Sequence, residues 1–169
     1  MDITRETTIG DAAPFLEEEH LKQLIDDPRV ASVMAVSVFD MTVGEFLEAL
    51  EPEYAIQKFF WNPEDNLLEA IGKLKNFRQQ MDDVQKILQL NEPKLSSEET
   101  QAQAGVVFPT YQESMLCDCI EWFHLRSMDE AEALPFSDYL VMKRKKGAEA
   151  LYERNLNKIY TQKAKQNSK

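Results

Sequence analysis

The amino-acid sequence predicts an all-α fold, with two small helical lobes around a long central helix. Three observations favour helices: the chain has only 5 Gly in 169 residues, it is rich in residues of high helix propensity, and capping sequences recur along it. Hydrophobic residues make up 43% of the chain, which is enough for a core, and charged residues make up 29%. Such a composition is typical of a folded protein and not of a disordered one.

The N-terminal lobe is expected to span residues 1–90. Residues 1–13 are polar and are predicted to be loose. A short helix is expected over Phe15–Ile25, because apolar side chains recur there with helical spacing. Residues 29–39 are apolar and β-branched, so their pattern leaves open whether they form one short strand or a buried helix.

A further helix is predicted to begin at Thr42. Thr42 and Glu45 have the spacing of a capping box, in which the Thr oxygen accepts one free backbone N–H and the Glu carboxylate accepts another. A short run rich in apolar side chains then follows over Tyr54–Trp61.

The central helix is predicted over residues 65–90. Asn62 and Pro63 form its start, because Asn is a good N-cap and Pro fits the first helical position. Its apolar positions recur every 3.5 residues on average, which is coiled-coil spacing. They are Leu67, Ile71, Leu74, Phe77, Met81, Val84 and Leu88. The spacing leaves open an amphipathic core helix or a seam that pairs with a partner, and we take these residues as candidate partner-binding residues.

The only clear linker is predicted over residues 91–109, which are mostly polar and contain Pro and Gly. The C-terminal lobe, residues 110–169, is expected to hold three helices, over residues 110–126, 127–134 and 135–163. Capping boxes open the first and the second of these helices, and a proline opens the third.

Charge is sorted along the chain. The net charge is −11, and it divides into −12 over residues 1–70, −6 over residues 71–140 and +7 over residues 141–169. An acidic body with a basic tail suggests a protein that meets its partners through electrostatics, other copies of itself included. Direct nucleic-acid binding is not expected except through the basic tail, because phosphates require clustered Lys and Arg.

Two features of the basic tail could serve a partner. The first is a run of four cations, which we take as candidate partner-binding residues, with plain solvated helix surface as the alternative. These are Lys143, Arg144, Lys145 and Lys146. The second is an apolar stripe between the charges, formed by Val141, Ala148, Leu151, Asn155 and Ile159.

No catalytic motif is present, and we expect no catalytic residue, metal or cofactor. His20 and His124 each follow a Glu by three residues, the Glu-x-x-His spacing of di-iron helical bundles, but too few residues precede His20 for the first helix of such a bundle. Cys117 and Cys119 diverge around a helix and do not have zinc spacing. Cys117 shares a helix face with Glu121 and His124, without a convincing fourth ligand.

The sequence favours a cytoplasmic protein that does not enter a membrane. Its N-terminus lacks the basic start and apolar run of a targeting signal. No apolar stretch approaches the ~20 residues that cross a bilayer. Its two cysteines are too close in sequence for a useful disulfide, which fits a reducing compartment.

Residues 109–160 contain an aromatic-bearing helix around Ile120–Leu125 (IEWFHL), then a short helix, then Leu134–Met142 (LPFSDYLVM) leading into a basic helix. This order resembles the small helical tail-assembly chaperones of long-tailed bacteriophages. The resemblance implies a non-enzymatic protein in a bacterial host cell that binds an unfolded or extended protein, such as a tape-measure protein, and can oligomerise.

The favoured interpretation is a protein-binding module of phage or mobile-element origin that acts as an assembly chaperone or adaptor. Its partner would be a phage or host protein, or a further copy of the chain. One alternative is an acidic inhibitor that occupies the nucleic-acid-binding groove of a host protein, with carboxylates as phosphate mimics. These carboxylates would be Glu17, Glu18, Glu19, Asp26, Asp27, Glu45, Glu48, Glu51 and Glu53. A metal-dependent helical-bundle oxidoreductase is a more distant alternative.

Overall fold

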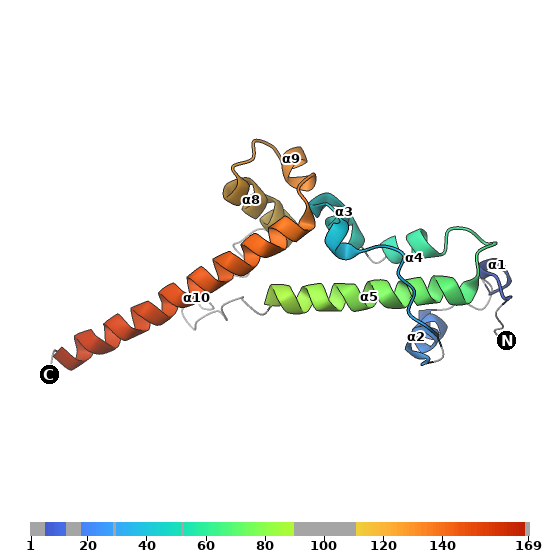
Figure 1. Ribbon diagram of the computed structural model, residues 1–169, viewed down its shortest axis with the longest axis horizontal. Coiled ribbons are helices and arrows are strands. Elements are labelled where there is room, and N and C mark those ends of the chain that lie inside the picture. Colours follow the sequence, from blue (N-terminus) through green and yellow to red (C-terminus); the bar gives the residue numbers. More distant parts are fainter. Residues whose placement is uncertain (1–5, 13–17, 29, 52, 90–110, 168–169) are drawn as a thin grey trace. The chain divides into compact units, whose positions relative to one another are not determined.

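The computed structural model describes residues 6–12, 18–28, 30–51, 53–89 and 111–167 (Figure 1). These residues form helices and no β-strand, which confirms the all-α fold class. The chain divides into two compact units, Met1–Asp83 and Val84–Lys169, and the division between them falls inside the central helix. The linker predicted over residues 91–109 lies outside the described residues and stays a prediction.

The described residues of unit 1 form five helical segments before the central helix. They are α1 (Ile9–Ala12), α2 (Glu18–Asp26), the 3₁₀ segment η2 (Val38–Asp40), α3 (Val43–Ala49) and α4 (Tyr54–Phe59). The central helix, α5 (Leu67–Gln89), is continuous, which confirms the long helix expected there. The helix expected over Phe15–Ile25 matches α2 from residue 18 onward, and its earlier part lies outside the described residues.

The prediction of a loose N-terminal segment is wrong for the four residues of α1. Thr8 caps this helix: its hydroxyl accepts the Asp11 N–H at 3.2 Å and donates to the Asp11 carboxylate at 2.8 Å. The hydrogen bonds that the Asp11 carboxylate accepts from the Thr8 hydroxyl and from the Thr8 N–H lower the pKa of Asp11. The Ile9 N–H also donates to the Asp65 carbonyl at 3.0 Å, so local capping and a long-range backbone contact both order the segment.

The cap of the central helix lies four residues later than Asn62, the residue expected to cap it. Asn62 instead forms a turn, in which its side-chain oxygen accepts the Glu64 N–H at 3.2 Å. Asn66 is the capping residue, because its side-chain oxygen accepts the Glu69 N–H at 3.0 Å. An isolated antiparallel bridge between Asn66 and Thr8 fixes the start of α5 against the N-terminal segment.

Residues 31–37 form neither a strand nor a helix. They run along α5. Polar side chains of α5 form hydrogen bonds with the backbone N–H and C=O groups of this segment, which in a sheet would pair with a neighbouring strand. The Gln80 side chain donates to the Val36 carbonyl at 2.9 Å and accepts the Val38 N–H at 2.8 Å. Lys75 donates to the Val30 carbonyl at 3.2 Å. The segment is therefore held in an extended form without a sheet.

A glycine lets this segment approach the backbone of α5. The Val33 N–H donates to the Gly72 carbonyl at 3.0 Å. A Cβ at Gly72 would lie 2.5 Å from the Ala31 carbonyl oxygen and 2.9 Å from a Val33 methyl group. No other residue type fits at this position of α5 without displacing the segment.

The core of unit 1 lies between α5 and the segments around it. Val38, Val43, Phe46, Leu67, Ile71, Leu74 and Phe77 are among its buried side chains. The Phe77 ring contacts the rings of Tyr54 and Phe59, with centroids 5.9 and 5.8 Å away. The capping box of α3 is confirmed, since Thr42 and Glu45 bind each other's backbone N–H groups.

Unit 2 contains the three helices expected in the C-terminal lobe. They are α8 (Tyr111–Phe123), α9 (Met128–Glu132) and α10 (Phe136–Asn167), the last drawn in orange to red in Figure 1. The capping residue expected at position 110 lies outside the described residues. The box expected for α9 is only half formed: Ser127 accepts the Glu130 N–H, but the Glu130 carboxylate accepts the Arg126 N–H at 2.7 Å.

The core of unit 2 is small and partly aromatic. Its buried side chains include Met115, Cys119, Ala131, Phe136, Tyr139 and Leu140. The Tyr139 ring stacks on the half-buried Trp122 at 5.8 Å, which joins α8 to the first turns of α10. These first turns therefore anchor α10, whereas few of its later residues are even half-buried.

Candidate functional site

The predicted seam of the central helix is part of the interior. Of its seven residues, six are at most 7% exposed and Met81 is half-buried. A partner could reach these side chains only if the surrounding structure opened. The structure thus favours the core interpretation over an exposed partner-binding seam.

The four predicted basic residues separate into one internal and three surface side chains. Lys143 is half-buried: its ammonium group lies 5.9 Å from the centre of the Trp122 ring and 3.5 Å from the Asp118 carboxylate. Arg144, Lys145 and Lys146 are exposed. Lys143 therefore serves the packing of α8 against α10, and only the other three can contact a partner.

The Asp118 carboxylate is part of this internal contact. Burial raises its pKa, while the charge of Lys143 and a hydrogen bond from it act in the opposite direction. The neighbouring Cys119 is fully buried, and burial together with the Asp118 charge raises the pKa of its thiol to about 11. A thiol of this kind is a poor nucleophile at neutral pH.

The residues considered for metal binding do not come together. His124 ends α8 with φ 55°, and the Leu125 N–H donates to the Ile120 carbonyl at 3.1 Å, as in a Schellman motif. His124 therefore leaves the helix face that Cys117 and Glu121 share. Within the described part of the chain, no three His, Cys, Asp or Glu side chains are grouped to hold a metal ion. His20 lies in α2.

The carboxylates considered as phosphate mimics are dispersed over several elements of unit 1. Glu45 is used in the capping box of α3, where it accepts the Thr42 N–H at 2.8 Å. Asp26, Glu48, Glu51 and Glu53 are exposed and Asp27 is half-buried. Glu17 and the side chains of Glu18 and Glu19 lie outside what the structure describes.

The most prominent unpartnered surface is on α10. Five large apolar side chains of this helix are exposed by 47 to 67%. They are Val141, Leu151, Tyr152, Ile159 and Tyr160. We call the face that carries Val141, Ala148, Leu151, Tyr152, Asn155 and Ile159 the α10 stripe, because at about 100° per residue these positions fall on one side of the helix.

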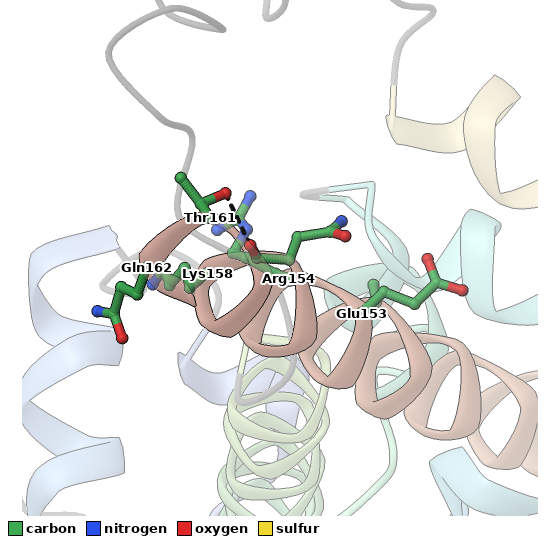
Figure 2. A pocket seen from close by; sticks show the side chains of 7 residues that line it. Glu153, Arg154, Lys158, Thr161 and Gln162 are labelled. Atoms are coloured by element: carbon green, nitrogen blue, oxygen red, sulfur yellow. Dashed lines mark hydrogen bonds between the residues drawn. The ribbon is translucent and has the colours of Figure 1, made fainter. Parts of the chain in front are cut away.

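The opposite face of α10 is polar. A shallow depression extends from this face to the edge of the stripe, where Lys158 and Gln162 lie. The described residues that line it are Ala150, Glu153, Arg154, Asn157, Lys158, Thr161 and Gln162, all of α10 (Figure 2). The Thr161 hydroxyl donates to the Asn157 carbonyl at 2.9 Å, so part of the polarity is satisfied within the helix. The described side chains around this depression all come from one helix, and they do not converge on a common point as catalytic groups do.

The sequence identified the α10 stripe but not two exposed tyrosines of this helix, Tyr152 within the stripe and Tyr160 outside it. Tyr152 and Tyr160 were missed because neither belongs to the five positions taken as apolar. Their signal is residue type: an exposed Tyr combines a large apolar ring with a hydroxyl that stays hydrated, which suits a contact surface.

The chain matches no protein-family model, no curated protein and no solved structure in the three comparisons made. Among the described helices, none combines the length and the apolar content that a membrane crossing needs.

Proposed function

We propose that this chain is a non-enzymatic protein-binding module, an assembly chaperone or adaptor, and that the α10 stripe is its contact surface. The observation that supports this proposal is the exposure of large apolar side chains at helical spacing along one side of a 32-residue helix. Single exposed apolar residues are common on proteins, but a periodic row of them marks a binding surface.

The stability of α10 supports the same proposal. From Arg144 to Gln166 only Gly147, Arg154 and Leu156 are even half-buried, so this part of the helix gains little from packing. In proteins, most of the stability of a helix comes from packing of its apolar face. A partner laid on the stripe would bury side chains that each contribute about 1.5–3 kcal/mol when fully removed from water.

Within this function, a phage tail-assembly chaperone is the specific class that the resemblance of residues 109–160 implies. That region includes α8, α9 and the whole α10 stripe. Its client would be a segment of a protein that awaits assembly.

Site-specific photocrosslinking tests the proposal. A benzophenone amino acid replaces Tyr152 on the stripe or, as the matched control, Asn157 on the polar face of the same helix. After irradiation in the native host, crosslinked products are identified by mass spectrometry. We expect a defined protein adduct from position 152 that is weak or missing from position 157. Equal adducts from both positions, or none from either, would contradict the proposal.

A further inference from the structure

We infer that the segment bound by the α10 stripe is an amphipathic helix whose flank is acidic, supplied by a partner protein. This inference rests on the proposed function and adds the chemistry of the partner. Two independent features of α10 carry it: the spacing of its exposed apolar positions and the charge beside them.

The spacing indicates that the occupant is a helix. Val141, Ala148, Tyr152, Asn155 and Ile159 follow the alternating steps of three and four residues that mark a helix–helix seam, with Lys145 completing the steps between the first two. All five positions are exposed. An extended peptide would place side chains every second residue and would not match a row with this period.

The charge indicates that the occupant is acidic. As a whole, α10 carries eight Lys and Arg against three Asp and Glu. On the side of the stripe next to Leu151, the helix presents Arg144, Lys158 and Lys165 and no carboxylate. These three cations are exposed, and none of them has an ion pair within the described part of the chain.

The other side of the stripe is mixed. Lys145 and Lys146 pair with Glu149 at 3.9 and 3.7 Å, and Lys163 lies further along the helix. Acidic side chains on a bound helix would therefore find their partners chiefly along the flank next to Leu151. That asymmetry gives the bound helix a preferred side, and so an orientation.

A second copy of α10 fits this surface less well than an acidic helix. In an antiparallel pair of two identical helices, the flank of Arg144, Lys158 and Lys165 would face its own copy, and like charges at this distance repel. In a parallel pair it would face the mixed flank, where Lys145, Lys146 and Lys163 outnumber Glu149. Charge complementarity thus favours a different chain.

An anionic membrane surface also fits less well. Glu149 lies close to the stripe, Asn155 lies at its centre, and the whole chain has a net charge of −11. Amphipathic helices that bind membranes concentrate cations on the polar face and keep the apolar face free of polar side chains.

The test uses the full chain and two synthetic helical peptides as probes. Both peptides carry the same Leu/Ile seam with steps of three and four residues, and their flanking positions are all Glu in one and all Lys in the other. Binding is measured by fluorescence anisotropy at 50 mM and 500 mM salt. We expect the Glu peptide to bind at least about tenfold more tightly at low salt, and this preference to shrink at high salt because the charges are screened.

Two surface variants make the result specific. Reversing the flank with Arg144→Glu, Lys158→Glu and Lys165→Glu should transfer the preference to the Lys peptide. Replacing the seam with Tyr152→Glu and Ile159→Glu should abolish the binding of both peptides. Circular dichroism checks that the helix content of each variant is unchanged, which is expected because all five side chains are exposed.

Each contrary result has a distinct meaning. Equal affinity for the two peptides, or a preference unmoved by the flank reversal, would overturn the acidic partner. A dimer in sedimentation velocity that Tyr152→Glu and Ile159→Glu dissociate would make the occupant a second copy, and binding to phosphatidylglycerol vesicles would make it a membrane; both overturn the inference. If neither peptide binds but position 152 still crosslinks to a protein, the inference fails and the proposed function stands.

Discussion

Replacing Gly72 by alanine tests how closely residues 31–37 lie against the central helix. Alanine has the higher helix propensity, so an exposed glycine in a helix interior would gain about 1 kcal/mol from this change. At Gly72 the added Cβ would lie 2.5 Å from the Ala31 carbonyl oxygen, and that oxygen would have to move by about 1 Å to reach ordinary contact distance. The neighbouring atom belongs to the backbone, so no side-chain rotation can relieve the clash.

The expected result is a net loss of stability. Overpacking of this kind costs about 1–3 kcal/mol. Displacing the segment also weakens the hydrogen bond from the Val33 N–H to the Gly72 carbonyl, which contributes about 1 kcal/mol. The higher helix propensity of alanine offsets about 1 kcal/mol of these losses. We therefore expect Gly72→Ala to lower the free energy of unfolding by about 1–3 kcal/mol.

Urea unfolding followed by circular dichroism measures this change. Gly147→Ala is the matched control, because Gly147 lies in the interior of α10 and is half-buried there. The control should be neutral or stabilising by up to about 1 kcal/mol. A Gly72→Ala variant as stable as the wild type or more stable would refute the close contact between residues 31–33 and α5.

Three further predictions follow from side-chain packing. Phe77→Ala should lower the free energy of unfolding by about 3–5 kcal/mol, since the ring is buried against two others, and a loss below about 1 kcal/mol would mean that it is not core. Maleimide should label the exposed Cys117 and spare the buried Cys119, and equal labelling of the two would contradict the burial. Because folding raises the pKa of Cys119 to about 11, the stability that this thiol contributes is lost as the pH rises from about 9 to 11. Cys119→Ala should reduce this loss. Lys143→Met should cost about 1–2 kcal/mol in thermal unfolding and the exposed Arg144→Met less than about 0.5, and equal effects would show that the contact with Trp122 is not formed.

Features set by neighbouring residues could be predicted from the sequence. The box of Thr42 and Glu45 formed as expected, because both partners lie within one turn. The start of the central helix could not be placed to the residue. Asn62 and Asn66 both have the chemistry of a cap, and Asn66 was selected because backbone groups around Thr8, nearly sixty residues earlier, pair with this part of the chain.

The extended segment along α5 shows a second limit. Its β-branched, apolar residues are typical of a strand or of a buried helix, and a local pattern cannot reveal that Gln80 and Lys75 supply the missing hydrogen bonds. Both side chains are polar and lie on a helix whose apolar side is core. From the sequence alone, such polar residues are expected to face the solvent. Here their side chains form the hydrogen bonds that a neighbouring strand would form with residues 30–38.

The candidate site depended on choosing between two stripes with the same spacing. The stripe of α5 consists entirely of large apolar residues, and nearly all of it is buried. The α10 stripe includes Ala148 and Asn155, with Lys145 at a seam position, and it is exposed. Spacing alone predicts a helix and an apolar side, but not what covers that side. What distinguishes the two stripes is whether every position is apolar. A buried stripe such as that of α5 must exclude water at every position, whereas an exposed stripe such as that of α10 can include polar residues.

The net charge of the chain does not decide which partner the α10 stripe accepts. At physiological ionic strength, charges act over about 8 Å, whereas a helix of 32 residues is about 48 Å long. A partner lying on the stripe therefore experiences mainly the cations that border it, such as Arg144, Lys158 and Lys165, and not the acidic total of −11. An acidic chain can in this way present a locally basic, apolar surface. Under the proposed function, the overall charge would oppose non-specific contact with nucleic acid and with other acidic proteins. The stripe would then be selective for a helix that satisfies both its apolar row and its basic flank.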